Sequence, residues 1–400
     1  MADNNENKVL NVPHLRFPEF SGEWEMSSIG EQFELYSGNT PSRMNKNQFD
    51  GSINWITSGE LKEHYISDTK EKISEEAAKN NSLKLLPVGT FVIAIYGLEA
   101  NGVRGTCSIT TRESTISQAC MAFTSKMDIQ NEFLYSWYKK HGNIIGIKYA
   151  QGTKQQNLSY DIIERFNISY PCMEEQKKLI RFISLIDQRI ATQNKIIEKL
   201  QSLIKGLNNT LQYDTGGKSV CLGDILLERS ERSQTNNQHE VLSSTVKGIF
   251  SQREYFSKDI ASENNVGYKI IRLHDVVLSP QNLWMGNINY NDRFEIGIVS
   301  PSYKVFSIAD GYDNQFVAAM LKTHRALYSY MMVSEQGASI VRRNLNMEAF
   351  SQLVFKIPSL DKQREIGYAI SLLKSQLKTA NKIIKAYTSQ KQYLLRQMFI

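Results

Sequence analysis

The stretch PCMEEQKKLIRFISLIDQRIATQNKIIEKLQSLIKGLNNTLQY (residues 171–213) occurs a second time, in altered form, as PSLDKQREIGYAISLLKSQLKTANKIIKAYTSQKQYLLRQMFI (residues 358–400). The second copy lies 187 positions further along, and the two copies align without a gap. Twelve positions are identical, among them the runs Ile183-Ser184-Leu185 and Asn194-Lys195-Ile196-Ile197. So many identities in one ungapped alignment indicate an internal duplication.

Apolar residues in both copies recur at alternating steps of four and three positions, which is the pattern of a coiled-coil seam. A segment of roughly forty residues in this pattern predicts a helix about 60 Å long. Each copy opens with a proline followed by acidic residues, as expected at a helix N-terminus. The expected seam positions are Leu179, Ile183, Ile186, Ile190, Ile197, Leu200, Ile204, Leu207, Ile366, Ile370, Leu373, Leu377, Ile384 and Leu394.

A seam of this length needs a partner, and the other copy in the same chain is the simplest one. We therefore expect two long antiparallel coiled-coil helices. The alternative is two independent amphipathic helices, but the apolar stripe of a surface helix is normally broader than a strict four-three seam. Gln193 and Ala380 interrupt the seam at equivalent positions, where we expect a polar side chain to lie opposite a small one or to contact another chain.

The remaining sequence alternates short apolar runs with turn residues, which favours a mixed α/β (α+β) fold for two globular domains. Before each long helix, Asn157-Leu158 and Asn344-Leu345 stand at the same distance from the helix-start proline, so the domains also belong to the pseudo-twofold internal repeat. The globular copies have diverged far more than the helices. The expected parts are an N-terminal arm (1–25), a first domain (26–170), a first helix (171–213), a second domain (214–357) and a second helix (358–400).

Composition excludes several classes of protein. The four cysteines lack the paired spacing of a zinc or disulfide framework, and no apolar stretch is long enough to span a membrane, so we expect a cytoplasmic protein. No GxGxxG or HExxH motif occurs, and Gly216-Gly217-Lys218-Ser219 lacks the first glycine of a phosphate-binding loop. We therefore predict no catalytic residue, no metal and no cofactor bound by this chain.

The net charge of +6 is unevenly distributed, since residues 346–400 hold nine basic and three acidic side chains while the globular parts are nearly neutral. DNA binding by those parts would depend on local patches and uncharged polar contacts. Four lysines add positive charge to the second long helix alone. They would face DNA, an acidic partner or only solvent, and they are Lys374, Lys378, Lys382 and Lys385.

The order of domain, repeated helix, domain and repeated helix resembles the specificity subunit of type I restriction-modification systems, over essentially the whole chain. The helix starts with Pro171 and Gln176 or Pro358 and Gln363, and the loop 37–42 (SGNTPS), carry this resemblance together with the duplication. It implies a non-catalytic reader of double-stranded DNA. Each globular domain would be a target-recognition domain that binds one half of a bipartite asymmetric sequence, and the helix pair would be a ruler that sets the gap.

The resemblance also implies partners and cofactors. Two modification (methyltransferase) subunits would dock on the helix pair and bring S-adenosylmethionine, and two restriction (translocase/nuclease) subunits would bring ATP and Mg. The complex would be an adenine-specific DNA methyltransferase and an ATP-dependent endonuclease. Two alternatives remain: a coiled-coil scaffold protein that binds only proteins, and an orphan DNA-binding regulator without a methyltransferase partner.

Candidate DNA-contacting residues come from loops, because base readout needs side chains that project from a rigid scaffold. Asn and Gln present the donor and acceptor pair that adenine requires, and Arg suits guanine or phosphate. In the first domain we predict Thr40, Ser42, Arg43, Tyr96, Arg104, Thr153, Lys154, Gln155, Gln156 and Asn157. In the second domain we predict Gln281, Asn282, Trp284, Ser339, Arg342, Arg343 and Asn344.

Overall fold

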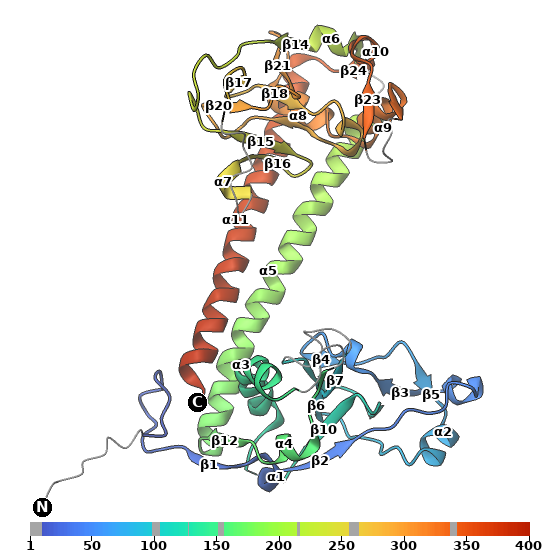
Figure 1. Ribbon diagram of the computed structural model, residues 1–400, viewed down its shortest axis with the longest axis vertical. Coiled ribbons are helices and arrows are strands. Elements are labelled where there is room, and N and C mark those ends of the chain that lie inside the picture. Colours follow the sequence, from blue (N-terminus) through green and yellow to red (C-terminus); the bar gives the residue numbers. More distant parts are fainter. Residues whose placement is uncertain are drawn as a thin grey trace, which may run out of the picture. The chain divides into compact units, whose positions relative to one another are not determined.

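The computed structural model describes residues 10–97, 105–126, 128–150, 156–213, 217–255, 264–336 and 342–400. The chain divides into two compact units, each of which contains a globular part and one segment from each long helix (Figure 1). Unit 1 comprises residues 1–192 and 384–400, and unit 2 comprises residues 193–383. The division therefore passes through both long helices, whereas the sequence analysis places its domain boundaries at the helix ends.

The core of unit 1 lies between a five-stranded sheet, a long helix and the attached segments of the coiled-coil helices. The strands follow the order β2-β10-β6-β8-β4, and all neighbours are antiparallel except β4 and β8. These strands are β2 (Phe33–Ser37), β10 (Cys120–Ser125), β6 (Phe91–Ala94), β8 (Cys107–Thr110) and β4 (Tyr65–Ile66). Around them lie α1 (Ile29–Gln32), α3 (Asn131–Tyr149), α4 (Tyr160–Glu164) and the ribbon of β1 (Glu25–Ser28) with β12 (Asn167–Tyr170).

An insertion between β2 and β6, together with β9 from between β8 and β10, forms a second, smaller layer in unit 1. Its three-stranded sheet has the order β5-β3-β9, and Trp55, Ile73 and Ala77 make a separate small core beneath it. The elements are η1 (Lys46–Phe49), β3 (Ile53–Ile56), η2 (Ser58–Glu60), β5 (Lys72–Ile73), α2 (Glu75–Asn80) and β9 (Ser114–Ile116). A short ribbon pairs β7 (Tyr96–Gly97) with β11 (Gln156–Asn157).

Unit 2 repeats the scaffold of unit 1. Its sheet has the order β14-β21-β18-β19, which matches β2-β10-β6-β8, and the ribbon of β13 with β24 matches that of β1 with β12. The bounds are β13 (Lys218–Cys221), β14 (Leu226–Arg229), β18 (Val276–Leu278), β19 (Ile288–Tyr290), β21 (Lys304–Ile308) and β24 (Val354–Ile357). The accompanying helices are α6 (Leu222–Ile225), α8 (Asn314–Met320), α9 (His324–Met332) and α10 (Met347–Ser351).

The additions to the scaffold differ between the units. Where unit 1 has one continuous helix α3, unit 2 has two helices, because Thr323 ends the first run and caps α9 through a hydrogen bond from Ala326 N (3.2 Å). The other elements particular to unit 2 are β15 (Leu242–Thr245), β16 (Gly248–Ser251), α7 (Gln252–Tyr255), β17 (Lys269–Arg272), η3 (Leu283–Met285), β20 (Ile296–Val299), β22 (Ser334–Gln336) and β23 (Arg343–Leu345).

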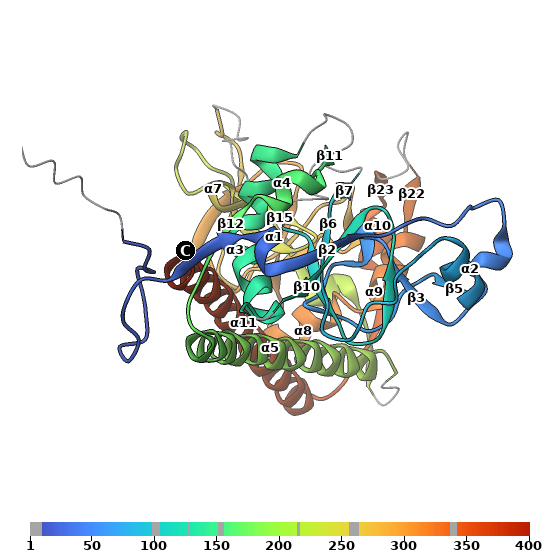
Figure 2. The same cartoon turned by 90° about the horizontal axis from the view of Figure 1, so that it is seen from below.

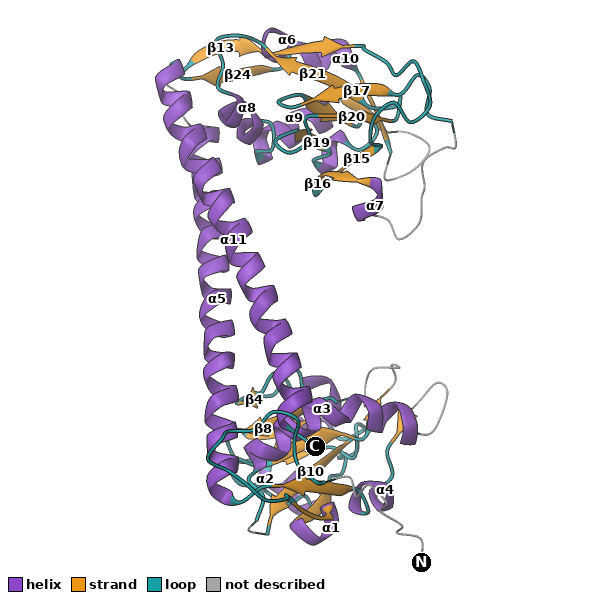
Figure 3. Ribbon diagram, turned by 90° about the vertical axis from the view of Figure 1, so that its left-hand side faces the viewer, coloured by secondary structure: helices purple, strands orange, loops and turns teal. Residues whose placement is uncertain are grey.

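The two long helices are α5 (Met173–Tyr213) and α11 (Leu360–Met398), and each begins two residues after its proline. Within each unit their segments run antiparallel (Figure 3), which confirms the expected fold class. All fourteen expected seam positions are buried or half-buried. In unit 2, Gln193 Nε2 donates to the backbone oxygen of Ala380 (3.2 Å), so the polar seam residue does lie opposite the small one.

A buried glutamine at the start of each long helix attaches the globular part of the same unit. The Gln176 amide donates to Pro171 O (2.9 Å) and Asp128 O (2.7 Å), and its oxygen accepts from Gln130 N just before α3 (3.0 Å). In unit 2, Gln363 likewise donates to Pro358 O (2.9 Å) and accepts from Asp313 N just before α8 (3.0 Å). Since both side chains are at most 2% exposed, these bonds fix the helix to its domain.

The N-terminal arm packs on unit 1, where both Figure 1 and Figure 2 place it beside the last turn of α11. Leu15 N donates to Gln397 O (2.9 Å). Arg16 makes a bidentate ion pair with Glu175, through Nε to Oε1 (2.8 Å) and Nη2 to Oε2 (2.7 Å). The described residues of the arm, 10–24, are therefore part of the folded unit.

Candidate nucleic-acid interface

In unit 1, the β7-β11 ribbon brings two of the expected DNA-contacting residues together. Asn157 lies directly opposite Tyr96 in the strand register, with Tyr96 half-buried and Asn157 exposed. The neighbouring Leu158 is fully buried, and its N–H donates to Ile95 O (2.8 Å), which holds the ribbon against the end of β6. Of the other residues expected here, Gln156 is described only by its backbone, and Arg104, Thr153, Lys154 and Gln155 lie outside the described residues.

Arg43 lies on the insertion of unit 1, in the loop that also carries half-buried Thr40 and exposed Ser42. Its guanidinium stands 4.6 Å from the ring centroid of Phe49 and 5.4 Å from that of Trp55. Both Glu71 carboxylate oxygens accept hydrogen bonds from it, with Nη2 to Oε2 at 2.9 Å. The guanidinium lowers the pKa of Glu71 below its usual value. An exposed arginine held by rings and a carboxylate is oriented in advance for a bidentate contact.

In unit 2, the structure gathers four of the expected residues from two distant parts of the chain. Arg343 N donates to Gln281 O (3.1 Å), which attaches β23 to the loop after β18. The Arg343 guanidinium lies 5.8 Å from the ring centroid of Trp284. Two polar atoms of this cluster, Asn282 Oδ1 and Arg343 Nε, are buried and have no hydrogen-bond partner in the described part of the chain. Unpaired buried polar atoms favour a site that a polar ligand completes.

The other residues expected in unit 2 lie beside this cluster or outside the described residues. Asn344 is exposed on β23, opposite Glu335 of β22. Arg342 is exposed immediately before the same strand, and Ser339 lies outside the described residues. The two units therefore present their expected residues differently, since unit 1 uses two separate loops and unit 2 one cluster.

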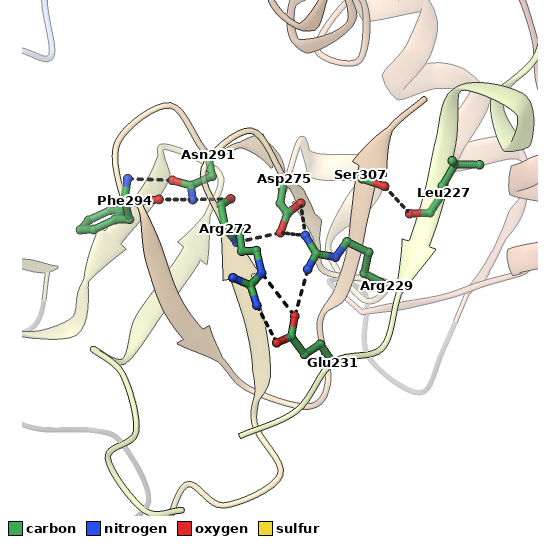
Figure 4. Close-up of polar contacts among 8 residues, drawn as sticks. All are labelled: Leu227, Arg229, Glu231, Arg272, Asp275, Asn291, Phe294 and Ser307. Atoms are coloured by element: carbon green, nitrogen blue, oxygen red, sulfur yellow. Dashed lines mark hydrogen bonds and ion pairs between the residues drawn. The ribbon is translucent and has the colours of Figure 1, made fainter. Parts of the chain in front are cut away.

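A polar network at the other end of β18 holds the scaffold of unit 2 (Figure 4). Arg229 Nη1 donates to both oxygens of Asp275 (3.1 and 3.2 Å), and its Nη2 donates to Glu231 (3.0 Å). Arg272 Nη2 donates to the second oxygen of Glu231 (2.7 Å), and this bond lowers the pKa of Glu231. Burial raises the pKa of Asp275, which is 2% exposed. No sequence signal predicts this network, because two of its members lie at the ends of β14 and β17 and the other two in the segments that follow these strands.

The described residues contain no group of three or more His, Cys, Asp or Glu side chains that could hold a metal ion. Over the same ranges, no helix combines the length and the apolar character needed to cross a membrane. The side chains in the candidate regions of both units include hydrogen-bonding amides, guanidinium groups and aromatic rings. These are the groups that contact base edges and phosphates in protein–nucleic acid complexes.

Comparison with known proteins supports the same interpretation. Residues 21–202 match the family model described as the type I restriction modification DNA specificity domain. The chain is 29% identical to the type I restriction enzyme MjaIX specificity subunit of Methanocaldococcus jannaschii, over 65% of this chain and 64% of that protein. It is 26% identical to the EcoR124I/EcoR124II specificity subunit of Escherichia coli, over 48% of this chain and 47% of that protein. Both matches span less than two thirds of the relatives' lengths.

Solved structures with a similar fold cover almost the whole chain. The S subunit of a type I restriction-modification system from M. genitalium superposes with a TM-score of 0.62 at 16% identity, over 97% of this chain and 99% of that one. A chain from a study of complex assembly and conformational transition in the type I R-M system has a TM-score of 0.55 at 13% identity, with the same coverage. At such identities these likenesses show the fold. The family resemblance seen in the sequence is confirmed by the match over residues 21–202.

Proposed function

We propose that the chain is the DNA sequence-specificity subunit of a type I restriction-modification system, on the premise that residues 21–202 match the family model of the type I restriction modification DNA specificity domain. The globular part of each unit would read one half of a bipartite asymmetric DNA target. The observation that carries this proposal is the repeated scaffold: two copies of one sheet order, attached to two copies of one helix, bear dissimilar loops. A reader of two unlike half-sites needs this combination.

The loops support DNA as the ligand. Unit 1 presents Arg43 between aromatic rings, and unit 2 presents Arg343 beside Trp284 with unpaired buried polar atoms. Arginine and amide side chains match the acceptor and donor patterns of guanine and adenine in the major groove. The long helices would act as the ruler, because their rigid length determines which half-sites are read together.

Partner docking is supported by identical exposed residues in the two helix copies. Leu185 and its counterpart Leu372 are 49% and 45% exposed, and Ile196 and its counterpart Ile383 are 44% and 38% exposed. These apolar side chains lie off the seam, so packing between the helices does not account for them. We assign them to two copies of one partner, the modification (methyltransferase) subunit. S-adenosylmethionine, ATP and Mg would be bound by the modification and restriction subunits, and this chain would carry out no catalytic step in the cytoplasmic complex.

The test is to co-express the chain with the modification subunit of its host and to map methylated adenines by single-molecule sequencing. We expect a split motif with two unlike halves and one fixed gap. Co-purification without new methylation would favour a coiled-coil scaffold protein. Tight sequence-specific binding by the purified chain in the absence of a methyltransferase would favour an orphan regulator.

A further inference from the structure

A pocket in unit 2 lies where the C-terminal half of α5 meets the corner between α8 and α9. Lys205 and Asn208 line it from α5, Lys322 and His324 from the corner, and Leu377 from α11. Lys374 stands one turn before Leu377 and acts electrostatically on Lys322. Two lysines and a histidine therefore line the pocket, with Lys374 of α11 near Lys322, and only the tertiary structure brings these groups together.

Lys322 is held in place by a neutral partner. Its Nζ donates to Asn289 Oδ1 (2.6 Å). The Asn289 side chain is 4% exposed, and its Nδ2 donates to Ser244 Oγ and Thr245 O (both 2.7 Å), so it cannot turn away without losing both bonds. An ammonium group has three donors, and a neutral amide leaves its positive charge uncompensated. Lys322 Nζ also donates to Val246 O (3.5 Å), so the geometry fixes a cation at the pocket and leaves one donor for another acceptor.

Among the described residues, lysines and a histidine line the pocket, and no carboxylate does. Burial first and Lys374 second lower the pKa of Lys322 to about 8. Lys374 is exposed to solvent but lies beside the globular part of unit 2, and desolvation lowers its pKa as well, against the opposing effect of Asp292. A nearby anion would favour the charged form of Lys322, which burial and Lys374 both disfavour. The N-terminus of α9 adds a favourable dipole for negative charge.

The corresponding place in unit 1 contains a carboxylate. The position of Lys374 in the helix repeat is occupied there by Asp187, whose carboxylate accepts a hydrogen bond from Lys391 Nζ (2.5 Å). Lys139, which aligns with Lys322, donates to Gly105 O (3.2 Å). The lysine cluster is therefore a property of unit 2 and does not follow from the duplicated scaffold.

We propose that this pocket binds a phosphate group of the DNA backbone next to the half-site that unit 2 reads. The proposal rests on the proposed DNA-reading function and deepens it, because it names a contact that positions the duplex without reading its sequence. Phosphate suits the pocket because it accepts several hydrogen bonds at once and its negative charge would compensate the positive charges of Lys205, Lys322 and Lys374. DNA is favoured over free phosphate because the same unit carries the candidate base-reading cluster.

The test uses the full chain in complex with its modification subunit. It measures the affinity for a duplex that contains the target sequence found by methylation mapping, over a series of salt concentrations. The variants are Lys322→Gln with Lys374→Gln, singly and together, and the matched control is Lys199→Gln, an exposed lysine of α5 that does not line the pocket. We expect the double variant to bind roughly five- to tenfold more weakly and to lower the salt slope by about one, with unchanged preference for the target. The control should behave like the unmodified complex.

Inorganic phosphate distinguishes the source of the group. If phosphate raises the melting temperature of the unmodified complex but not of the double variant, while DNA affinity and salt slope are equal in both, the pocket binds free phosphate and the DNA assignment is wrong. Equal behaviour in both assays overturns the proposal altogether. If the complex without substitutions shows no preference for the sequence that it methylates, the proposed function itself is wrong. This outcome would be seen before any variant is compared.

Discussion

The two units share a scaffold and differ in what they attach to it. Strands β2, β10, β6 and β8 have the same order as β14, β21, β18 and β19, and a buried glutamine joins each scaffold to its long helix. Between β2 and β6, unit 1 inserts β3 and β5, which form a three-stranded sheet with β9, whereas unit 2 inserts the β15-β16 hairpin and the β17 strand between β14 and β18. The part that meets the helices is repeated, and the part that faces outward is not. The comparison teaches that one scaffold can present two unrelated recognition surfaces.

The largest expected effect concerns the shared part. Replacement of Gln176 by leucine should destabilise unit 1 by about 3 kcal/mol, because two buried carbonyls and one N–H lose their partner. Gln363→Leu should destabilise unit 2 by about 2 kcal/mol, since it removes two bonds. Chemical denaturation of the full chain measures both changes. The exposed Gln188→Leu is the control and should stay within about 0.5 kcal/mol.

If Gln176→Leu and Gln363→Leu lowered the free energy of unfolding no more than Gln188→Leu, neither glutamine would be needed to attach its domain to the long helix. If only one of the two substitutions lowered stability, the glutamine of the other unit would be a remnant of the duplication with no role in stability.

The next effect concerns the part that differs. Arg343→Ala should weaken binding of the target by roughly ten- to a hundredfold, because Arg343 is the candidate for bidentate contact in unit 2. In the methylated motif, the half read by unit 2 should become degenerate while the other half is kept. Adenine mapping measures this, with the exposed Arg364→Ala on α11 as control. Degeneracy in both halves would contradict separate reading by the two units.

A smaller effect is expected in unit 1. Glu71→Gln removes the negative charge and one of the two oxygens that accept hydrogen bonds from Arg43. Binding to unrelated DNA should rise about threefold through the unmatched positive charge, and discrimination at one base of the first half-site should fall by a similar factor. Competition assays with target and unrelated duplexes measure both quantities. Unchanged discrimination would remove Arg43 from the reading surface.

The smallest effect is a pH dependence restricted to unit 2. Because the pKa of Lys322 lies at about 8, the side chain is mostly charged at pH 7 and mostly neutral at pH 9. Lys205, Lys374, His324 and Asp292 are the other charged or titratable groups around it. DNA affinity should therefore fall about threefold from pH 7 to pH 9 in the unmodified complex, and this part of the fall should vanish in Lys322→Gln. Parallel pH curves for the two proteins would show that Lys322 does not meet DNA.

Part of the site follows from sequence and part does not. The importance of Arg343, Trp284 and Gln281 is suggested by residue type and loop position, yet their proximity depends on how β23 attaches to the loop after β18. The pairing of Arg43 with Glu71 has no sequence signal, because residues of two separate loops have no common period. The same holds for the proximity of Lys322 and Lys374, since Lys374 is singled out by the sequence only as one of four lysines on its helix and Lys322 not at all.

By itself, the sequence determined the duplication, the two long helices and the seam between them, because a repeat of three and four residues is a local pattern that dictates one face of a helix. It also determined the weak seam position, where Gln193 meets Ala380. Only the tertiary structure decided which loops meet on each scaffold, which lysines share a pocket, and how Gln176 and Gln363 hold their domains. Those contacts join residues that are distant along the chain, and their geometry is set by sheet order and strand register, which no short stretch of sequence encodes.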